Sequence, residues 1–256
     1  MKVRILGSGT SSGVPRIGND WGECDPAEPR NRRTRASLLV EHDGTTILVD
    51  TGPDMREQLL AADVARIDAV IWTHDHADHC HGIDDLRQVY HAMGHPVRGY
   101  ARAEVLDAIT ARFAYAFAGR AGYPPTIAAA ILPDMLTIGG ITVRVVDQPH
   151  GNIRSAGLRF EAGGAAVGYA TDFSHVTPEM ATLYEGLDVW IADALRRRPH
   201  PTHANLKTVL EWVERLRPDR TALIHMDQTM DNATLAVELP GGIEPGYDGL
   251  TFDLDR

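Results

Sequence analysis

The stretch Thr73-His74-Asp75-His76-Ala77-Asp78-His79 decides both the fold and the chemistry that this sequence predicts. It places three histidines and Asp78 directly after an apolar segment, 68–73, that is typical of a buried strand. Imidazole and carboxylate are the usual ligands of zinc and similar divalent ions. Side chains two apart in an extended backbone face the same way, so His74 and His76 can bind one ion. Asp78 and His79, where the chain turns into a helix, can face a second ion.

Three further candidate ligands, His150, Asp172 and His225, stand at the ends of strand-like segments later in the chain. A single histidine at such a position is more often a cap or a surface residue. Together with the histidine-rich stretch, however, these three residues complete the ligand set of a site for two divalent ions.

The composition is that of an acidic globular protein. Of 256 residues, 43% are hydrophobic and 23% are charged, and the net charge is −10. Such a surface repels polyphosphate backbones, so nucleic acid is not favoured as a partner. The length predicts one domain over 1–256, and two cysteines, Cys24 and Cys80, give no disulfide framework. The chain lacks a long apolar run and a signal peptide, so we expect no membrane partner and a cytoplasmic location.

Strand patterns alternate with helix patterns along the chain, without internal repeats. This alternation predicts an α/β fold of stacked sheets with helices outside. Strands are expected over 3–6, 37–41, 46–50, 68–73, 142–147, 156–161, 165–170, 188–192, 221–225 and 250–254. Helices are expected over 54–62 (with Pro53 at the first turn), 82–92, 104–117, 178–184 and 205–216. Residues 7–35 are expected to form a long loop, and residues 118–136 have no clear pattern.

The order His74-x-His76-x-Asp78-His79, then His150, Asp172 and His225, resembles the metallo-β-lactamase superfamily over most of the chain. The resemblance implies an αββα sandwich of two mixed sheets flanked by helices. It also implies two divalent metal ions, zinc or manganese. The implied ligands are His74, His76 and His150 for one ion, Asp78, His79 and His225 for the other, and Asp172 as the bridge.

Two ions about 3.5–4 Å apart can share a bridging water and lower its pKa, so that hydroxide exists near neutral pH. This hydroxide would attack a phosphorus or carbonyl centre. The carboxylate of Asp172 would offset part of the metal charge, and we count Asp78 and Asp172 among the catalytic residues as well as the ligands.

Two further segments favour phosphodiester chemistry. Residues 6–15, Leu-Gly-Ser-Gly-Thr-Ser-Ser-Gly-Val-Pro, resemble the opening of tRNase Z and of the phosphoribosyl 1,2-cyclic phosphate phosphodiesterase. Residues 199–208 resemble the region of the latter that carries a catalytic histidine outside the metal site, with His203 at the matching place and His200 as the weaker candidate. A histidine there can protonate a leaving alkoxide. The run Arg196–Arg198 either clamps a phosphate or is simply solvated.

The chain also departs from these families. The stretch between His150 and Asp172 is long enough only for a hairpin, which leaves no room for the RNA-binding arm of tRNase Z. True β-lactamases lack a bridging carboxylate, and the short stretch after His225 does not fit the helical C-terminal region of glyoxalase II. The early loop has one cysteine, Cys24, where the cyclic phosphodiesterase has a cysteine-rich zinc site, so we expect no structural zinc.

Residues 101–136 are longer than the cyclic phosphodiesterase requires. They would form either a lid over the site or a surface for a homodimer. Within them, Tyr115, Phe117 and Tyr123 either stack a base or sugar or serve as packing residues.

The sequence therefore predicts a dinuclear metallohydrolase for a small phosphodiester, such as a cyclic ribose phosphate or a nucleotide-like substrate, with His203 as the general acid. A carboxyl ester, thioester or lactone hydrolysed at the same two-metal site is the second hypothesis. The sequence also leaves open RNA processing of the tRNase Z kind and nucleotide binding without catalysis.

Overall fold

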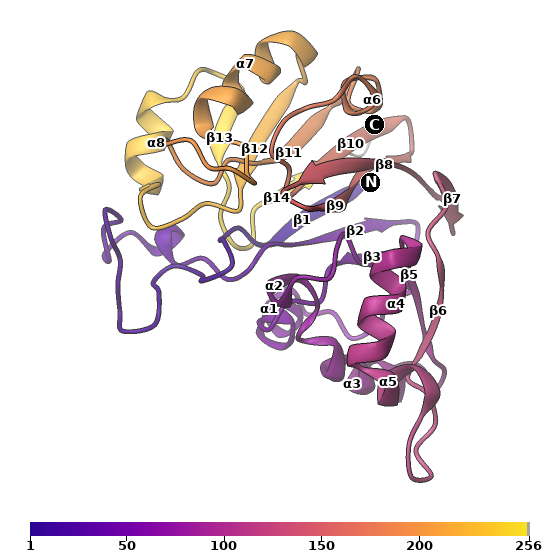
Figure 1. Ribbon diagram of the computed structural model, residues 1–256. Coiled ribbons are helices and arrows are strands. Elements are labelled where there is room, and N and C mark those ends of the chain that lie inside the picture. Colours follow the sequence, from indigo (N-terminus) through magenta and orange to yellow (C-terminus); the bar gives the residue numbers. More distant parts are fainter. Residues whose placement is uncertain (255–256) are drawn as a thin grey trace.

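Two stacked β-sheets form the centre of the computed structural model, which describes residues 1–254 (Figure 1). Within these residues each sheet has seven strands. The first has the order β14 (Thr251–Asp253), β1 (Lys2–Gly7), β2 (Ser37–His42), β3 (Thr45–Val49), β4 (Ala69–Ile71), β5 (Val97–Ala101) and β6 (Ile127–Ile131). The second has the order β13 (Ile243–Pro245), β12 (Arg220–Ile224), β11 (Val189–Asp193), β10 (Ala165–Ala170), β9 (Ile153–Ala162), β8 (Ile141–His150) and β7 (Met135–Ile138).

The core lies between the two sheets. Alternate residues of each strand face inward, as the period of two requires. Val40 and Ile47 of the first sheet and Phe160 and Ile191 of the second belong to one buried cluster. The sheets therefore pack face to face, which leaves their outer faces to be covered by helices.

Two groups of helices cover these outer faces (Figure 1). The first sheet carries α1 (Met55–Ala62), α3 (Leu86–Met93), α4 (Ala103–Arg112) and α5 (Ala114–Ala118). The second carries α6 (Pro178–Leu183), α7 (Leu206–Leu216) and α8 (Asn232–Glu238). The predicted αββα sandwich of two mixed sheets is thus confirmed. No helix within residues 1–254 combines the length and the apolarity needed to cross a bilayer.

The direction of the strands determines where a site can form. Each sheet has three antiparallel pairings on one side and three parallel pairings on the other. The parallel pairs include β3 with β4, β10 with β11, and β11 with β12. Parallel neighbours end at the same edge of their sheet. The segments that follow these strands therefore lie close together, and they carry the predicted ligands.

Several predicted elements need correction. The predicted helix 104–117 is interrupted at Phe113, whose dihedral angles are not helical (φ −121°, ψ 38°). The Phe113 ring packs edge-on against His81. Helix 54–62 begins at Met55, so Pro53 precedes the helix instead of occupying its first turn. Residues 118–136, left unassigned, supply β6 and the start of β7. Helix 82–92 begins with the 3-10 turn Ile83–Asp85.

Four further helices and strands have no counterpart among the predicted ones. They are α2 (Ala77–Cys80), β5, α8 and β13. Helix α8 begins at a side-chain cap, because Asp231 Oδ1 accepts a hydrogen bond from Thr234 N (2.9 Å).

The loop 7–35 is held in place by Asp248, which lies just before β14. One Asp248 carboxylate oxygen accepts hydrogen bonds from Ser8 N (2.9 Å) and Ser8 Oγ (2.8 Å). The other accepts from Thr34 N (2.7 Å) and Thr34 Oγ1 (2.6 Å). Gly9 then bridges to both Arg35 and Met226, and a Cβ on Gly9 would lie only 2.8 Å from Arg33 Cβ. Asp248 therefore joins both ends of the long loop to the C-terminal segment.

Replacement of Asp248 by alanine is expected to lower the free energy of unfolding by about 2–4 kcal/mol, because several donors lose their acceptor. Denaturant unfolding of the variant measures this difference. Asp107→Ala, at an exposed position of α4, is the control and should change the free energy by less than about 0.5 kcal/mol. Equal stability of the two variants would contradict the role of Asp248.

Candidate metal centre

Three histidines and Asp172 form the first group of candidate ligands. His74 and His76 lie on the segment after β4, and His150 is the last residue of β8. One ligand atom of each lies within 4.8 Å of the others and of an Asp172 oxygen. His150 Nδ1 donates a hydrogen bond to Thr202 O (2.9 Å), which leaves its Nε2 facing this group. His74 is fully buried, whereas His76 is exposed and marks the open side of the site.

A second group forms beside the first. Asp78 and His79 lie on the short helix α2, and His225 directly follows β12. Asp78 Oδ2 lies 3.2 Å from His79 Nε2 and 3.5 Å from His225 Nε2. All three residues are largely or fully buried. The structure therefore brings Asp78, His79 and His225 together as a second group of candidate ligands.

Asp172 lies between the two groups and faces both. Its Oδ1 is 3.8 Å from His74 Nε2 and 3.5 Å from His150 Nε2. Its Oδ2 is 3.2 Å from His79 Nε2 and 3.5 Å from His225 Nε2. Asp172 and His225 both adopt left-handed backbone conformations (φ 53° and 57°), which turn their side chains out of the strand direction at the sheet edge.

The donor atoms of these residues fit divalent cations. The Nε2 atoms of His74, His79 and His225 are buried and lack a hydrogen-bond partner. Buried polar atoms without partners are costly, and cations coordinated by these nitrogens would satisfy them. Histidine nitrogen and carboxylate oxygen are the donors that zinc, manganese and iron accept.

The protonation of the cluster is suited to metal binding. Burial lowers the pKa of His74 and His150, so these rings are neutral. Burial opposes ionisation of Asp172, yet the histidines around it hold its pKa well below the usual range. Despite burial, Asp172 and neighbouring carboxylates raise the pKa of His225 to about 9 and that of His79 well above the ordinary value. Metal binding must therefore displace protons from His79 and His225.

Asp50, which directly follows β3, is a supporting residue that the sequence analysis missed. It is fully buried and accepts hydrogen bonds from His79 Nδ1 (2.7 Å), Thr73 N (2.7 Å) and Thr73 Oγ1 (2.8 Å). This contact fixes the tautomer of His79 and points its Nε2 into the cluster. The signal that identified Asp172 in the sequence was a carboxylate at the end of a strand-like segment. Asp50 also ends such a segment, so the same signal could have identified it.

His203 faces the cluster from the second sheet. Its Nδ1 donates to Asp193 Oδ2 (2.7 Å), and its Nε2 lies 3.9 Å from Asp172 Oδ1. It precedes helix α7, which begins at the N-cap Asn205, so it lies in the connecting segment and not in the first helical turn. Asp193, the last residue of β11, was not identified from the sequence. It holds the ring of His203 so that one nitrogen points at the cluster.

His200 lies next to His203, and the centroids of their rings are 5.1 Å apart. Arg196, Arg197 and Arg198 line a separate cavity of about 330 Å³, and neither His200 nor His203 is among the residues that line it.

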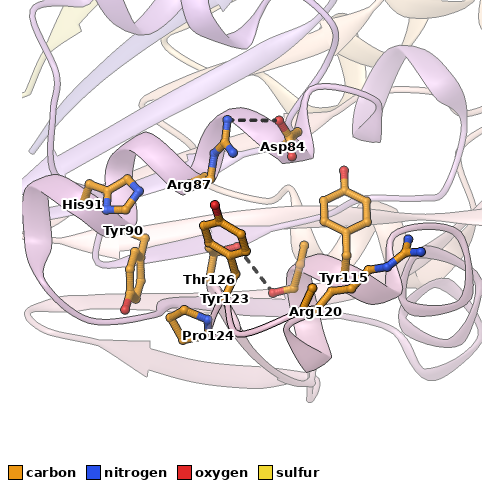
Figure 2. Close-up of a pocket in the computed structure, with 11 residues that line it drawn as sticks. Asp84, Arg87, Tyr90, His91, Tyr115, Arg120, Tyr123, Pro124 and Thr126 are labelled. Carbon is orange, nitrogen blue, oxygen red and sulfur yellow. Dashed lines mark hydrogen bonds and ion pairs between the residues drawn. The ribbon is translucent and has the colours of Figure 1, made fainter.

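Residues 101–136 contribute to both sheets: α4 and α5 cover the outer face of the first sheet, β6 is its edge strand, and β7 begins in the second sheet. Tyr115 and Tyr123 line a cavity of about 340 Å³ between α3 and the segment after α5 (Figure 2). Phe117 instead packs against Trp72. None of the metal-cluster residues lines this cavity within residues 1–254. Arg112, the last residue of α4, donates hydrogen bonds to Asp75 O (2.6 Å) and Asp75 Oδ2 (3.0 Å). These hydrogen bonds connect α4 to the histidine-rich stretch.

Comparison with known proteins assigns the chain to a family. Residues 45–226 match the model of the β-lactamase superfamily domain. A solved structure described as a new diphosphatase from the PhnP family is 33% identical, covers 99% of this chain and 97% of its own, and superposes with a TM-score of 0.90. An octanoyltransferase from Porphyromonas gingivalis is 32% identical over 265 residues. It matches the whole of this chain, which spans about half (52%) of that relative. A ribonuclease Z from Kineococcus radiotolerans is 30% identical over 138 residues, covering 52% of this chain and 39% of that protein.

Replacement of Asp50 by asparagine is expected to weaken binding of a divalent cation by about 10- to 100-fold, because His79 loses the acceptor that orients it. Competition with a chromogenic chelator measures the affinity. Asp43→Asn, at a side chain that is 85% exposed in the β2–β3 turn, is the control. Wild-type affinity in Asp50→Asn would show that His79 is oriented by other contacts.

Proposed function

The chain belongs to the metallo-β-lactamase superfamily, and from this membership and the geometry of the site we propose that it is a hydrolase of small phosphodiesters. The proposed enzyme holds two divalent cations, zinc or manganese. Its substrate is a cyclic ribose phosphate or a nucleotide-like diester.

The position of Asp172 is the observation that carries this proposal. Its two oxygens face two separate groups of ligands, each with at least two histidines. One carboxylate shared in this way is what a pair of neighbouring cations requires. Two cations bound there would supply a water acidic enough to act as nucleophile near pH 7, and positive charge for the phosphate oxygens.

His203 performs the second task, protonation of the leaving oxygen. Asp193 accepts the Nδ1 proton of His203, so Nε2 is the nitrogen through which this ring would pass a proton to the leaving oxygen. Asp193 Oδ1 also lies 3.8 Å from His225 Nδ1. Asp193 therefore lies next to both rings but forms its hydrogen bond with His203 alone.

Two observations favour phosphorus over carbon as the reacting centre. The connecting segment that carries His203 also carries Arg196, Arg197 and Arg198, and guanidinium groups suit phosphate oxygens. The names of two relatives, a diphosphatase and a ribonuclease, also describe chemistry at phosphorus. A large RNA is the less suitable substrate, because β9 and β10 occupy the stretch between His150 and Asp172 where an RNA-binding arm would be inserted.

Hydrolysis of an acyl ester or thioester is the second candidate. The octanoyltransferase relative, matched along the whole chain, handles an acyl group by its name and supports this candidate. That name describes a protein of twice the matched length, so its activity does not have to belong to the matched half. An octanoyl thioester is therefore the comparison substrate for the assay.

Metal-loaded protein is expected to hydrolyse bis(p-nitrophenyl) phosphate. Asp172→Ala should abolish turnover, since both groups of ligands lose their shared carboxylate. His203→Ala should lower the rate by about 10²-fold or more on a diester with an alkyl leaving group, which needs a proton more than p-nitrophenolate does. Steady-state kinetics measure both effects, with exposed His95 replaced by alanine as the control.

A protein that binds two cations per chain and turns over no diester would overturn the phosphodiesterase assignment. Turnover of the octanoyl thioester under the same conditions would establish the second candidate in its place. Tight binding of a nucleotide without turnover of either substrate would instead indicate a binding protein.

A further inference from the structure

Two edge strands of the sandwich, β6 and β7, lie on the same side of the molecule (Figure 1). Residues 132–134 connect them directly, so the edges of both sheets open onto one surface. Neither strand contains a charged residue. Their sequences are Ile-Ala-Ala-Ala-Ile and Met-Leu-Thr-Ile. We call β6 and β7 together the apolar edge.

Exposed apolar side chains gather at the apolar edge. Ile131 at the end of β6 is 62% exposed, and Met135 at the start of β7 is 58% exposed. Tyr123, shortly before β6, is 76% exposed. The alanines of residues 128–130 are exposed as well. Apolar side chains that are gathered on one surface indicate an interaction site, whereas single scattered ones do not.

The backbone of β6 has a free hydrogen-bonding side. Val97 N donates to Thr126 O (2.9 Å) and Leu132 N donates to Ala101 O (2.8 Å), so the even-numbered residues of this segment direct their backbone groups toward β5. Because the direction alternates along a strand, the odd-numbered residues of 127–131 direct theirs away from β5. No strand within residues 1–254 pairs with β6 on that side. Such an unpaired row is a template for another strand.

The edge strands at the other ends of the two sheets are protected against such pairing. β13 contains Glu244 and Pro245, and β14 ends at Asp253. Charged residues, proline and short length are the means by which natural sheets keep their edges from pairing. β6 has neither charge nor proline and is longer than β13 and β14. The unprotected edge is therefore suited to a partner strand.

We propose that a second copy of this chain pairs with the apolar edge, β6 against β6 in antiparallel direction, with the two-fold axis at Ala129. This dimer does not depend on the function proposed above. Ile131 of one copy lies opposite Ile127 of the other. The Ile127 side chain already belongs to the buried cluster beneath α4 and α5, which the second copy extends. Tyr123 of one copy and Met135 of the other come to the same end of the paired strands.

The sequence of β6 favours its own copy over a foreign strand. Ile-Ala-Ala-Ala-Ile is the same in both directions, so an antiparallel copy places isoleucine opposite isoleucine and alanine opposite alanine. The nearest acid, Asp134, is paired with Arg102 (2.7 Å). Two chains of net charge −10 thus meet at a surface without uncompensated charge. Added salt should strengthen the dimer, because it screens the repulsion between the remaining charges.

Sedimentation equilibrium of the full chain tests the proposal. We expect a mass of twice 28.0 kDa that falls toward the monomer on dilution. Ile131→Lys should weaken the dimer by about 10- to 100-fold, because lysine at an edge strand opposes pairing. Val237→Lys makes the same kind of change at an 87% exposed apolar side chain of α8 and should leave the dissociation constant unchanged. Circular dichroism checks that both variants are folded.

Disulfide crosslinking tests the position of the two-fold axis. In the proposed pair the two Cα atoms of residue 129 are about 5.5 Å apart, within the range of a disulfide. Mild oxidation should therefore link Ala129→Cys chains in pairs. Ala111→Cys, at an exposed position of α4, should stay unlinked, and so should the unsubstituted chain, because Cys24 and Cys80 are buried.

Three outcomes overturn the proposal. The first is a chain that stays monomeric at every concentration, whether or not another protein occupies the apolar edge. The second is a dimer with a dissociation constant that Ile131→Lys leaves unchanged. The third is a dimer in which Ala129→Cys forms no crosslink. The assays of diester hydrolysis are separate from all three, so the phosphodiesterase and the dimer can fail independently.

Discussion

A buried carboxylate among buried imidazoles is the constraint on which the rest of this molecule depends. Asp172 is 2% exposed, and the four histidines nearest to its two oxygens, His74, His79, His150 and His225, are at most 3% exposed. Such groups are tolerable inside a protein only when charge and hydrogen bonding are satisfied. The parallel strands bring the ligands to one edge, and left-handed conformations at Asp50, Asp172 and His225 turn the side chains toward each other. Asp50 accepts a hydrogen bond from Nδ1 of His79, and Asp193 accepts one from Nδ1 of His203.

The candidate ligands stand out in the sequence because short segments carry their chemistry. His74, His76, Asp78 and His79 are neighbours in the chain, and His150, Asp172 and His225 each follow a strand-like segment. The sandwich itself followed from alternating strand and helix patterns and from the family resemblance. Both signals can be seen in the sequence alone, because neither depends on which strand lies beside which.

The supporting residues could not be predicted in this way. Asp50 and Asp193 are recognisable only through the rings that they hold, which belong to other strands. The break at Phe113 depends on its contact with His81, and β6 becomes a strand because β5 offers a free edge. Likewise, three adjacent arginines read as a solvated run. In the structure their side chains have different partners: Arg197 pairs with Glu238, far along the chain, whereas Arg196 donates a hydrogen bond to Pro199 O in its own segment.

The origin of the ligands in both sheets has a mechanical consequence. His74, His76, Asp78 and His79 follow a strand of the first sheet, whereas His150, Asp172 and His225 belong to the second. Divalent cations held between these residues would connect the two sheets, so that the sheets could not separate at this edge without loss of coordination. Release of such ions and local opening of the sandwich would then be coupled. The rate of amide hydrogen exchange at the ends of β4, β10 and β12 would then depend on whether cations are bound. Exchange in strands far from this edge would not depend on it.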